Sequence, residues 1–300
     1  MPPTLELHGL SKRFGDFQAV REVTLEVSPG TIFGLLGPNG AGKTTTIRMI
    51  MDILGPDAGE VRFQGRRRTR DDLDRVGYLP EERGLYRKMT VTEQLVFLGE
   101  LHDRRKAETA PKIATWLEKV GLADWAESKI EELSKGMQQK IQLVGTLLHE
   151  PDLLILDEPF SGLDPINQAL FKDVLSEYKA SGRTVLFSTH VMEQAEKLCD
   201  HIGLIAKGTV VLAGELAAIK RQLGGRSFRV TSPGDLDGIE RIAGIESVLG
   251  ENGVRRILLT AEADDTEILK SLVERFPIRG FSSEEPTLEE IFVKAVHDAE

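Results

Sequence analysis

The chain has 300 residues, which at roughly 150 residues per domain predicts two domains, each long enough to bury a core. Hydrophobic residues make up 40% and charged residues 29%, a composition typical of folded globular proteins that excludes a disordered chain. The formal net charge of -10 argues against broad electrostatic capture of nucleic acid, so we expect no nucleic-acid partner.

Three features bear on where the protein works. No stretch approaches the ~18 consecutive apolar residues that span a bilayer. The first ten residues show neither the basic nor the apolar region of a secretion signal. Cys199, the one cysteine, has no partner for an internal disulfide. We therefore expect a cytoplasmic protein.

Strands alternate with helices along residues 1–224. Strands are predicted over residues 4–8, 23–27, 32–36, 61–63, 76–79, 153–157 and 184–188, with a hairpin over 202–206 and 209–212. Helices are predicted from 42 to about 54, over most of 92–148 with breaks near 102–103, 121 and 134–136, and over 166–178 and 191–198. This alternation predicts an α/β fold with a largely parallel sheet.

A second module is predicted after the glycine pair Gly224–Gly225, where we place the domain boundary. Its elements are strand 227–231, helix 236–242, strands 245–249 and 254–259, helix 265–275, strand 278–282 and a last helix over 287–297. The order βαββαβ is that of a ferredoxin-like module. Residues 225–300 are therefore predicted to form a small α+β domain.

One segment carries a phosphate-binding pattern. The residues Gly37, Pro38, Asn39, Gly40, Ala41, Gly42, Lys43 and Thr44 match G-x-x-x-x-G-K-[ST] after an apolar strand and at the start of a helix. Such a loop turns backbone N–H groups toward a polyphosphate, and the helix N-terminus adds partial positive charge. We expect Lys43 to reach the β- and γ-phosphates and the Thr44 hydroxyl to ligate Mg²⁺, with Thr45 in the nucleotide-binding set. ATP and Mg²⁺ are the expected cofactors.

Three further side chains are predicted at the same sheet edge. Asp157 and Glu158 end a buried strand, where carboxylates are costly unless they serve a metal or a reaction. Asp157 fits the Mg²⁺ shell, and Glu158 fits the base that orients or deprotonates a water. His190 follows another strand, and parallel sheets gather ligand contacts at the carboxyl ends of their strands. Capping of the next helix, or a solvated histidine, is the structural alternative.

The chain from about residue 5 to 216 resembles the ATP-binding subunit of ATP-binding cassette (ABC) transporters. The resemblance rests on the segment Leu133-Ser134-Lys135-Gly136-Met137-Gln138, which is similar to the family signature Leu-Ser-Gly-Gly-Gln and lies upstream of the acidic strand. Ser134 and Gly136 match, and the resemblance implies that they contact a γ-phosphate; Lys135 and Met137 depart from the pattern. Residues 161–164 look like the family's D-loop.

The resemblance also implies roles for isolated residues. Phe14 takes the place of the aromatic that stacks on adenine, with Phe17 as a competing candidate. His190 takes the place of the switch histidine, and we expect it to stabilise the γ-phosphate together with Lys43. Glu81 takes the place of the Q-loop glutamine, where a carboxylate can still bind Mg²⁺ but cannot donate a hydrogen bond. A helical subdomain over about 85–135 is implied as well.

The resemblance implies an assembly. Cassettes of this family pair head to tail, each nucleotide lying between the phosphate loop of one and the signature of the other, so we expect a homodimer. The resemblance also implies a separate membrane permease of the exporter (ABC-2) type, which would anchor the subunit at the inner face of the cell membrane. ATP hydrolysis by the subunit would drive transport through this permease. Residues 286–292 are similar to the ending of the accessory domain found in such exporter ATPases.

Two other functions stay open at this point. A soluble ABC ATPase that remodels ribosome or DNA complexes is one, and a P-loop kinase with a small-molecule substrate is the other. The basic run 66–70 could be a nucleic-acid patch, although the acids that follow it favour a solvated hairpin. Trp116 and Trp125 are expected to be packing residues.

Overall fold

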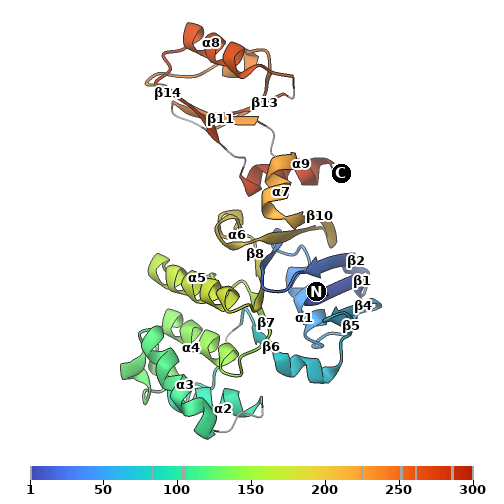
Figure 1. Ribbon diagram of the computed structural model, residues 1–300, viewed down its shortest axis with the longest axis vertical. Helices are drawn as coiled ribbons and strands as arrows, with labels where there is room; N and C mark the ends of the chain where they lie inside the picture. Colours follow the sequence, from blue (N-terminus) through green and yellow to red (C-terminus); the bar gives the residue numbers. More distant parts are fainter. Residues whose placement is uncertain are drawn as a thin grey trace. The chain divides into compact units, whose positions relative to one another are not determined.

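The structure, a computed structural model, describes residues 2–82, 84–102, 106–223, 226–250, 253–260, 262–284 and 287–298. The chain divides into two compact units, Met1–Ala213 and Gly214–Glu300 (Figure 1). The glycine pair at which we placed the boundary lies outside the described residues. The units divide before it, so α7 (Leu216–Leu223) belongs to the second unit, where it packs against α9 (Leu288–Asp298).

A six-stranded sheet runs through the first unit. In spatial order its strands are β10 (Thr209–Glu215), β9 (His201–Ala206), β3 (Ile32–Leu36), β8 (Thr184–Thr189), β7 (Leu153–Asp157) and β6 (Val76–Leu79). The five from β9 to β6 are parallel, and every residue of β3, β7 and β8 is buried. Both faces of these strands are covered, which explains the uninterrupted apolar runs 32–36 and 153–156.

A second sheet of this unit is antiparallel. Its strands are β2 (Phe17–Val27), β1 (Leu5–Phe14), β4 (Ala58–Phe63) and β5 (Arg66–Arg67). β1 and β2 are longer than predicted because their pairing continues through register shifts that break the two-residue alternation. One core joins both sheets to α1 (Lys43–Ile50), with Leu25, Phe33 and Ile47 among its members.

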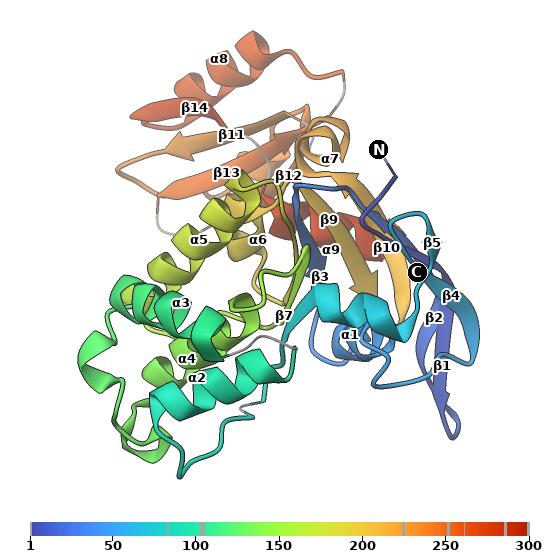
Figure 2. The same ribbon diagram turned by 60° about the horizontal axis from the view of Figure 1, so that its bottom comes forward.

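The helical subdomain contains α2 (Val91–Glu100), α3 (Lys106–Lys119) and α4 (Lys135–Leu147), which pack on one another (Figure 2). Their own core includes Leu95, Leu117 and Val144, and Trp116 packs against it, whereas Trp125 is 38% exposed. Two further helices, α5 (Pro165–Ala180) and α6 (Met192–Leu198), pack on β8.

The second unit contains an antiparallel sheet in the order β12 (Ile245–Leu249), β13 (Val254–Leu259), β11 (Arg226–Thr231) and β14 (Gly280–Glu284), with α8 (Asp265–Arg275). This strand order is that of the ferredoxin-like fold. The helix predicted over 236–242 is wrong: only a 3₁₀ turn, η4 (Ile239–Arg241), forms there. Left-handed Gly238 precedes the turn, and Leu236, Ile239 and Ile242 reach the core from it without a helix.

Candidate functional site

The phosphate-binding loop connects β3 to α1. Gly37 opens it with φ 152°, and a Cβ there would lie 2.2 Å from the carbonyl oxygen of Ile205, so only glycine fits. Pro38, Asn39 and Gly40 are exposed. Gly42 caps α1 without a side-chain bond, and no acidic residue occupies the first turn, which leaves the positive end of the helix dipole open to an anion.

Lys43 lies across this loop and is nearly buried, at 6% exposure. Its Nζ donates to the carbonyl oxygens of Gly37 at 2.8 Å and Pro38 at 3.2 Å. The same atom lies 3.3 Å from Oε1 of Glu158. The ammonium group is thus held inside the loop by two carbonyls and one carboxylate.

Asp157 ends β7 and is buried. Its Oδ1 accepts hydrogen bonds from the hydroxyls of Thr44 at 3.2 Å and Ser188 at 2.5 Å. Its Oδ2 is buried and has no hydrogen-bond partner among the residues described. An orphaned carboxylate oxygen beside a threonine hydroxyl is a donor set that suits Mg²⁺, so these two residues fit the predicted metal shell.

Glu158 follows in left-handed backbone geometry, with φ 49°. Its N–H donates to Ser188 Oγ at 3.0 Å, and its Oε2 lies 3.0 Å from Nδ1 of His190. The carboxylate, 9% exposed, therefore sits between the Lys43 ammonium and the His190 imidazole, whose side chain is 43% exposed.

The register between the parallel strands explains why these side chains lie close together. Leu36 pairs with Thr189 across β3 and β8, and Asp157 pairs with Ser188 across β7 and β8. The phosphate loop, the Asp157–Glu158 pair and His190 therefore leave the parallel sheet at its carboxyl edge, where such sheets bind ligands. The structure brings Lys43, Thr44, Asp157, Glu158 and His190 together; their roles stay predictions.

Ser134 and Gly136 lie apart from this cluster. Ser134 is the exposed N-cap of α4 and accepts from the N–H of Met137 at 3.3 Å. Gly136 packs against Asn167, whose amide bonds Asp164, the N-cap of α5. Among the described residues, no hydrogen bond or ion pair joins Ser134 or Gly136 to the phosphate loop.

Phe14 and Phe17 face each other at the tip of the β1–β2 hairpin, with exposed fractions of 49% and 64%. The Lys12 ammonium lies 5.9 Å from the centre of the Phe14 ring. Glu81 is exposed and follows β6, which is parallel to β7, so it leaves the sheet at the same edge as Asp157. Within the described ranges, no hydrogen bond or ion pair joins Glu81 to the cluster.

Two residues of the site escaped sequence reasoning. Ser188 bridges Asp157 and Glu158 as described above. Gln139 on α4 donates to the carbonyl of Pro159 at 2.8 Å and so ties the signature helix to the turn after β7. The signal available for Ser188 was a hydroxyl inside an apolar strand, which Thr184 and Thr189 of the same strand share, and Gln139 had no such signal.

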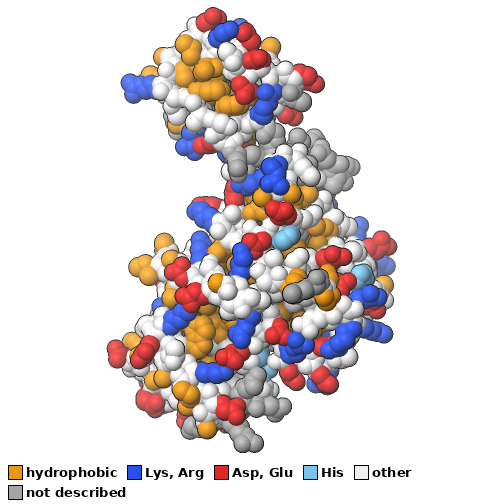
Figure 3. All heavy atoms as spheres, in the orientation of Figure 1, with side chains coloured by type: hydrophobic (Ala, Val, Ile, Leu, Met, Phe, Trp, Pro, Cys, Tyr) orange, Lys and Arg blue, Asp and Glu red, His pale blue; other side chains and the backbone are white. Residues whose placement is uncertain are grey.

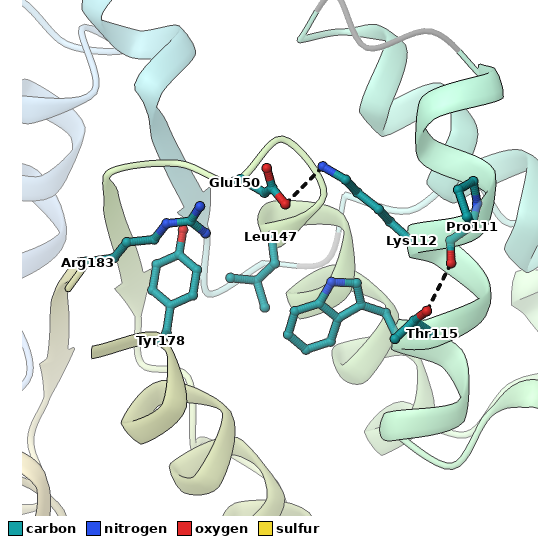
Figure 4. Close-up of a pocket in the computed structure, with 8 residues that line it drawn as sticks. Pro111, Lys112, Thr115, Leu147, Glu150, Tyr178 and Arg183 are labelled. Carbon is teal, nitrogen blue, oxygen red and sulfur yellow. Dashed lines mark hydrogen bonds and ion pairs between the residues drawn. The ribbon is translucent and has the colours of Figure 1, made fainter. Parts of the chain in front are cut away.

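The pocket shown in Figure 4 is separate from the site around Asp157 and Glu158. It has a volume of about 310 Å³ and is lined by side chains of α3, α4 and α5 together with Glu150 and Arg183. Glu150 and Arg183 precede β7 and β8, so the pocket lies at the opposite end of the parallel strands from Asp157. The Lys112–Glu150 ion pair of 2.9 Å spans it.

The basic run 66–70 is partly neutralised. Arg66 makes two hydrogen bonds to buried Asp72, and Arg68 lies 2.7 Å from Asp52. Basic and acidic side chains are interspersed over the face drawn in Figure 3. This pairing favours the hairpin interpretation of the run.

Comparisons with known proteins assign the chain to a family. A family model described as "ABC transporter" matches residues 20–161, and one described as "ATP-binding protein DrrA1-3-like, C-terminal domain" matches residues 214–296. The chain is 42% identical to the ABC transporter ATP-binding protein YhaQ of Bacillus subtilis, over 97% of this chain and 98% of the relative. It is 31% identical to the daunorubicin resistance ATP-binding protein DrrA3 of Streptomyces coeruleorubidus, over 98% and 96%.

A solved structure described as an ATP binding subunit of an ABC transporter aligns with a TM-score of 0.67 and 33% identity, covering 73% of this chain and 92% of that one. No helix in the described part of the chain is both long and apolar enough to cross a bilayer. The chain belongs to the ABC transporter family as an ATP-binding subunit, in which an ATP-binding cassette is followed by a DrrA-like C-terminal domain.

Proposed function

We propose that this subunit hydrolyses ATP to ADP and phosphate and thereby powers export through a separate membrane permease. The observation that carries the proposal is the convergence of Lys43, Asp157, Glu158 and His190 at one sheet edge, within hydrogen-bond or ion-pair distance of one another or of shared partners. The family membership supports ATP as the nucleotide.

Each side chain has a distinct task in this proposal. The loop N–H groups and Lys43 bind the phosphates and stabilise the negative charge that develops on the γ-phosphoryl oxygens. Glu158 orients the attacking water and accepts its proton. His190 holds the Glu158 carboxylate through Nδ1, and its side chain is 43% exposed, which leaves it open to a γ-phosphate from the solvent side.

Mg²⁺ suits the pair of Thr44 and Asp157, because Oδ2 of Asp157 is a buried acceptor with no partner among the described residues. The ion would supply charge neutralisation at the phosphates. Thr44 and Asp157 would hold it, and their mutual hydrogen bond of 3.2 Å already places the two oxygen donors beside each other.

The proposal includes a head-to-tail homodimer. Ser134 is exposed at the N-terminus of α4, and in the described residues no hydrogen bond or ion pair joins it to the phosphate loop of its own chain, so a second cassette would bring the signature to the nucleotide. ATP would close the pair and hydrolysis would release it.

Named relatives support export through a permease as the proposed task. DrrA3 and the linearmycin resistance protein LnrL of Bacillus subtilis, 32% identical over 96% of this chain, are named for drug resistance, which supports export as the direction of transport. The subunit would work in the cytoplasm, bound to the inner face of the membrane through its permease. Action on ribosomes or DNA has no such support from these relatives.

Two measurements test the proposal with the full chain. Release of phosphate from ATP is measured with and without Mg²⁺, and absence of turnover under all conditions contradicts hydrolysis. A tagged copy is then purified in mild detergent from its own membranes, and the proteins that co-purify with it are identified. Recovery of a multi-helix membrane protein supports transport, whereas recovery of ribosomes or DNA instead would support the rival function.

A further inference from the structure

A serine hydroxyl joins the two acidic residues of the site. Ser188 lies on β8, directly across from Asp157 on β7, and its side chain is fully buried. Its Oγ donates to Oδ1 of Asp157 at 2.5 Å and accepts from the N–H of Glu158 at 3.0 Å. One hydroxyl thus contacts the side chain of one residue and the backbone of the next.

The direction of both hydrogen bonds is fixed by chemistry. A backbone N–H can only donate, so it occupies a lone pair of the Ser188 oxygen. The single hydroxyl proton is then directed at the Asp157 carboxylate, which can only accept when ionised. A donor beside a carboxylate gives a short, charge-assisted bond, and 2.5 Å agrees with that.

This bridge restrains both acids. Thr44 and Ser188 both bond Oδ1 of Asp157, which turns Oδ2 away from them as the oxygen without a partner. Glu158 adopts φ 49°, a left-handed geometry that is strained for a residue with a Cβ. The hydrogen bond from its N–H to Ser188 stabilises this turn, and the turn aims the carboxylate at Lys43 and His190.

We infer that Ser188 is a positioning residue that couples the orientation of Asp157 to the backbone geometry of Glu158. The inference deepens the hydrolysis proposed above and rests on it for its kinetic consequence. Its structural consequence is independent of hydrolysis: without the hydroxyl, the Glu158 N–H loses its acceptor and the Asp157 carboxylate loses one of its two restraints.

Three variants of the full chain test this. Ser188→Ala removes both hydrogen bonds, and Ser188→Thr keeps the hydroxyl. Thr184→Val is the matched control, because Thr184 begins the same strand and is buried. Its hydroxyl likewise makes two hydrogen bonds, one shared with the hydroxyl of Thr4 at 3.0 Å and one accepted from the N–H of Gly30 at 3.0 Å. Thermal unfolding of all three variants shows how much stability each change costs.

The first readout is amide hydrogen exchange at residue 158, measured without nucleotide or metal. We expect Ser188→Ala to accelerate this exchange by about fivefold to tenfold and Thr184→Val to leave it unchanged. The second readout is phosphate release as a function of Mg²⁺ concentration. We expect Ser188→Ala to lower kcat by roughly 10- to 100-fold and to raise the Mg²⁺ concentration at half-maximal rate, while Mg²⁺-free ATP binding is retained.

Rescue of both readouts by Ser188→Thr supports the role of the hydroxyl. Unchanged exchange at residue 158 in Ser188→Ala overturns the coupling, as does a rate loss in Thr184→Val equal to that in Ser188→Ala. If the wild-type chain releases no phosphate, the proposed hydrolysis fails, and the exchange measurement still decides the positioning role. If Ser188→Thr does not fold, Ser188→Ala and Thr184→Val decide it.

Discussion

Lys43 and Glu158 form an ion pair of 3.3 Å at the carboxyl edge of the parallel sheet, with exposed fractions of only 6% and 9%. Each of these two charged groups also has a polar partner outside the ion pair. Lys43 also bonds two loop carbonyls, and Glu158 also bonds His190. A buried pair of this kind is costly to break from one side, because the remaining charge stays in the interior. A substitution that tests the role of Glu158 should therefore keep the size and shape of its side chain.

Glu158→Gln keeps the shape and removes the base. We expect ATP turnover to fall by about 10²- to 10⁴-fold, because an amide cannot accept the proton of the attacking water. Nucleotide binding should persist, and size-exclusion chromatography with ATP should show an accumulated dimer. Both are measured on the full chain.

Glu150→Gln is the matched control for this variant. Glu150 lies before β7 and Glu158 lies directly after it. Both residues have left-handed backbone geometry, with φ 56° for Glu150 and 49° for Glu158. Turnover of the control should equal that of the wild type. Wild-type turnover in Glu158→Gln would show that this residue is not the base.

Gly37→Ala tests the shape of the phosphate loop. The added Cβ would meet the Ile205 carbonyl oxygen at 2.2 Å, and this oxygen belongs to the backbone, which cannot yield as the end of a flexible side chain can. We expect a loss of at least about 2 kcal/mol in the free energy of unfolding together with loss of ATP binding. Denaturant unfolding and ATP titration measure these two quantities.

Gly15→Ala separates backbone strain from steric clash. Gly15 also has a positive φ of 56°, but a Cβ there has nothing within 4 Å. Its cost should be about 1–2 kcal/mol, from left-handed geometry alone. Equal destabilisation by the two variants would show that the contact with Ile205 does not matter.

The sequence predicts an element of the fold well where a single hydrophobic pattern determines its structure. The continuous apolar run at residues 153–157 predicts a strand buried on both faces, and β7 has the same bounds. The helix predicted over 236–242 failed because Leu236, Ile239 and Ile242 satisfy a helical spacing that a 3₁₀ turn also provides. Ser188 could not be assigned a role, because its contact with Asp157 depends on the register between β7 and β8.

Asp72→Asn tests the pairing inside the basic run. Burial would raise the pKa of Asp72, but hydrogen bonds from the Thr69 backbone and Arg66 outweigh burial and lower it below the ordinary 3.8. A lowered pKa stabilises the fold at pH values above 3.8, and this stabilisation is lost as pH falls through the folded-state value. At pH 7 we expect Asp72→Asn to cost about 1–3 kcal/mol of unfolding free energy.

The difference between wild type and Asp72→Asn should shrink as the pH drops below 4, because the wild-type carboxyl then becomes neutral too. Denaturant unfolding at several pH values measures it. Asp71→Asn is the control, since Asp71 is exposed next to the buried Asp72. A difference that stays constant with pH would show that the ionised carboxylate is not what stabilises the hairpin.

Ser134→Glu tests the head-to-tail pair. Ser134 is the exposed N-cap of α4, and a glutamate there would place negative charge where the proposed dimer brings the γ-phosphate of the partner's nucleotide. We expect Ser134→Glu, combined with Glu158→Gln, to bind ATP as Glu158→Gln does but to remain monomeric with ATP in size-exclusion chromatography. Loss of the serine N-cap costs about 0.5–2 kcal/mol, which the fold should tolerate. Thr115→Glu, an exposed position on α3 of the same subdomain, should leave ATP-dependent dimerisation intact. If the variant that combines Ser134→Glu with Glu158→Gln dimerises at the same ATP concentration as Glu158→Gln alone, the signature segment does not lie in the dimer interface.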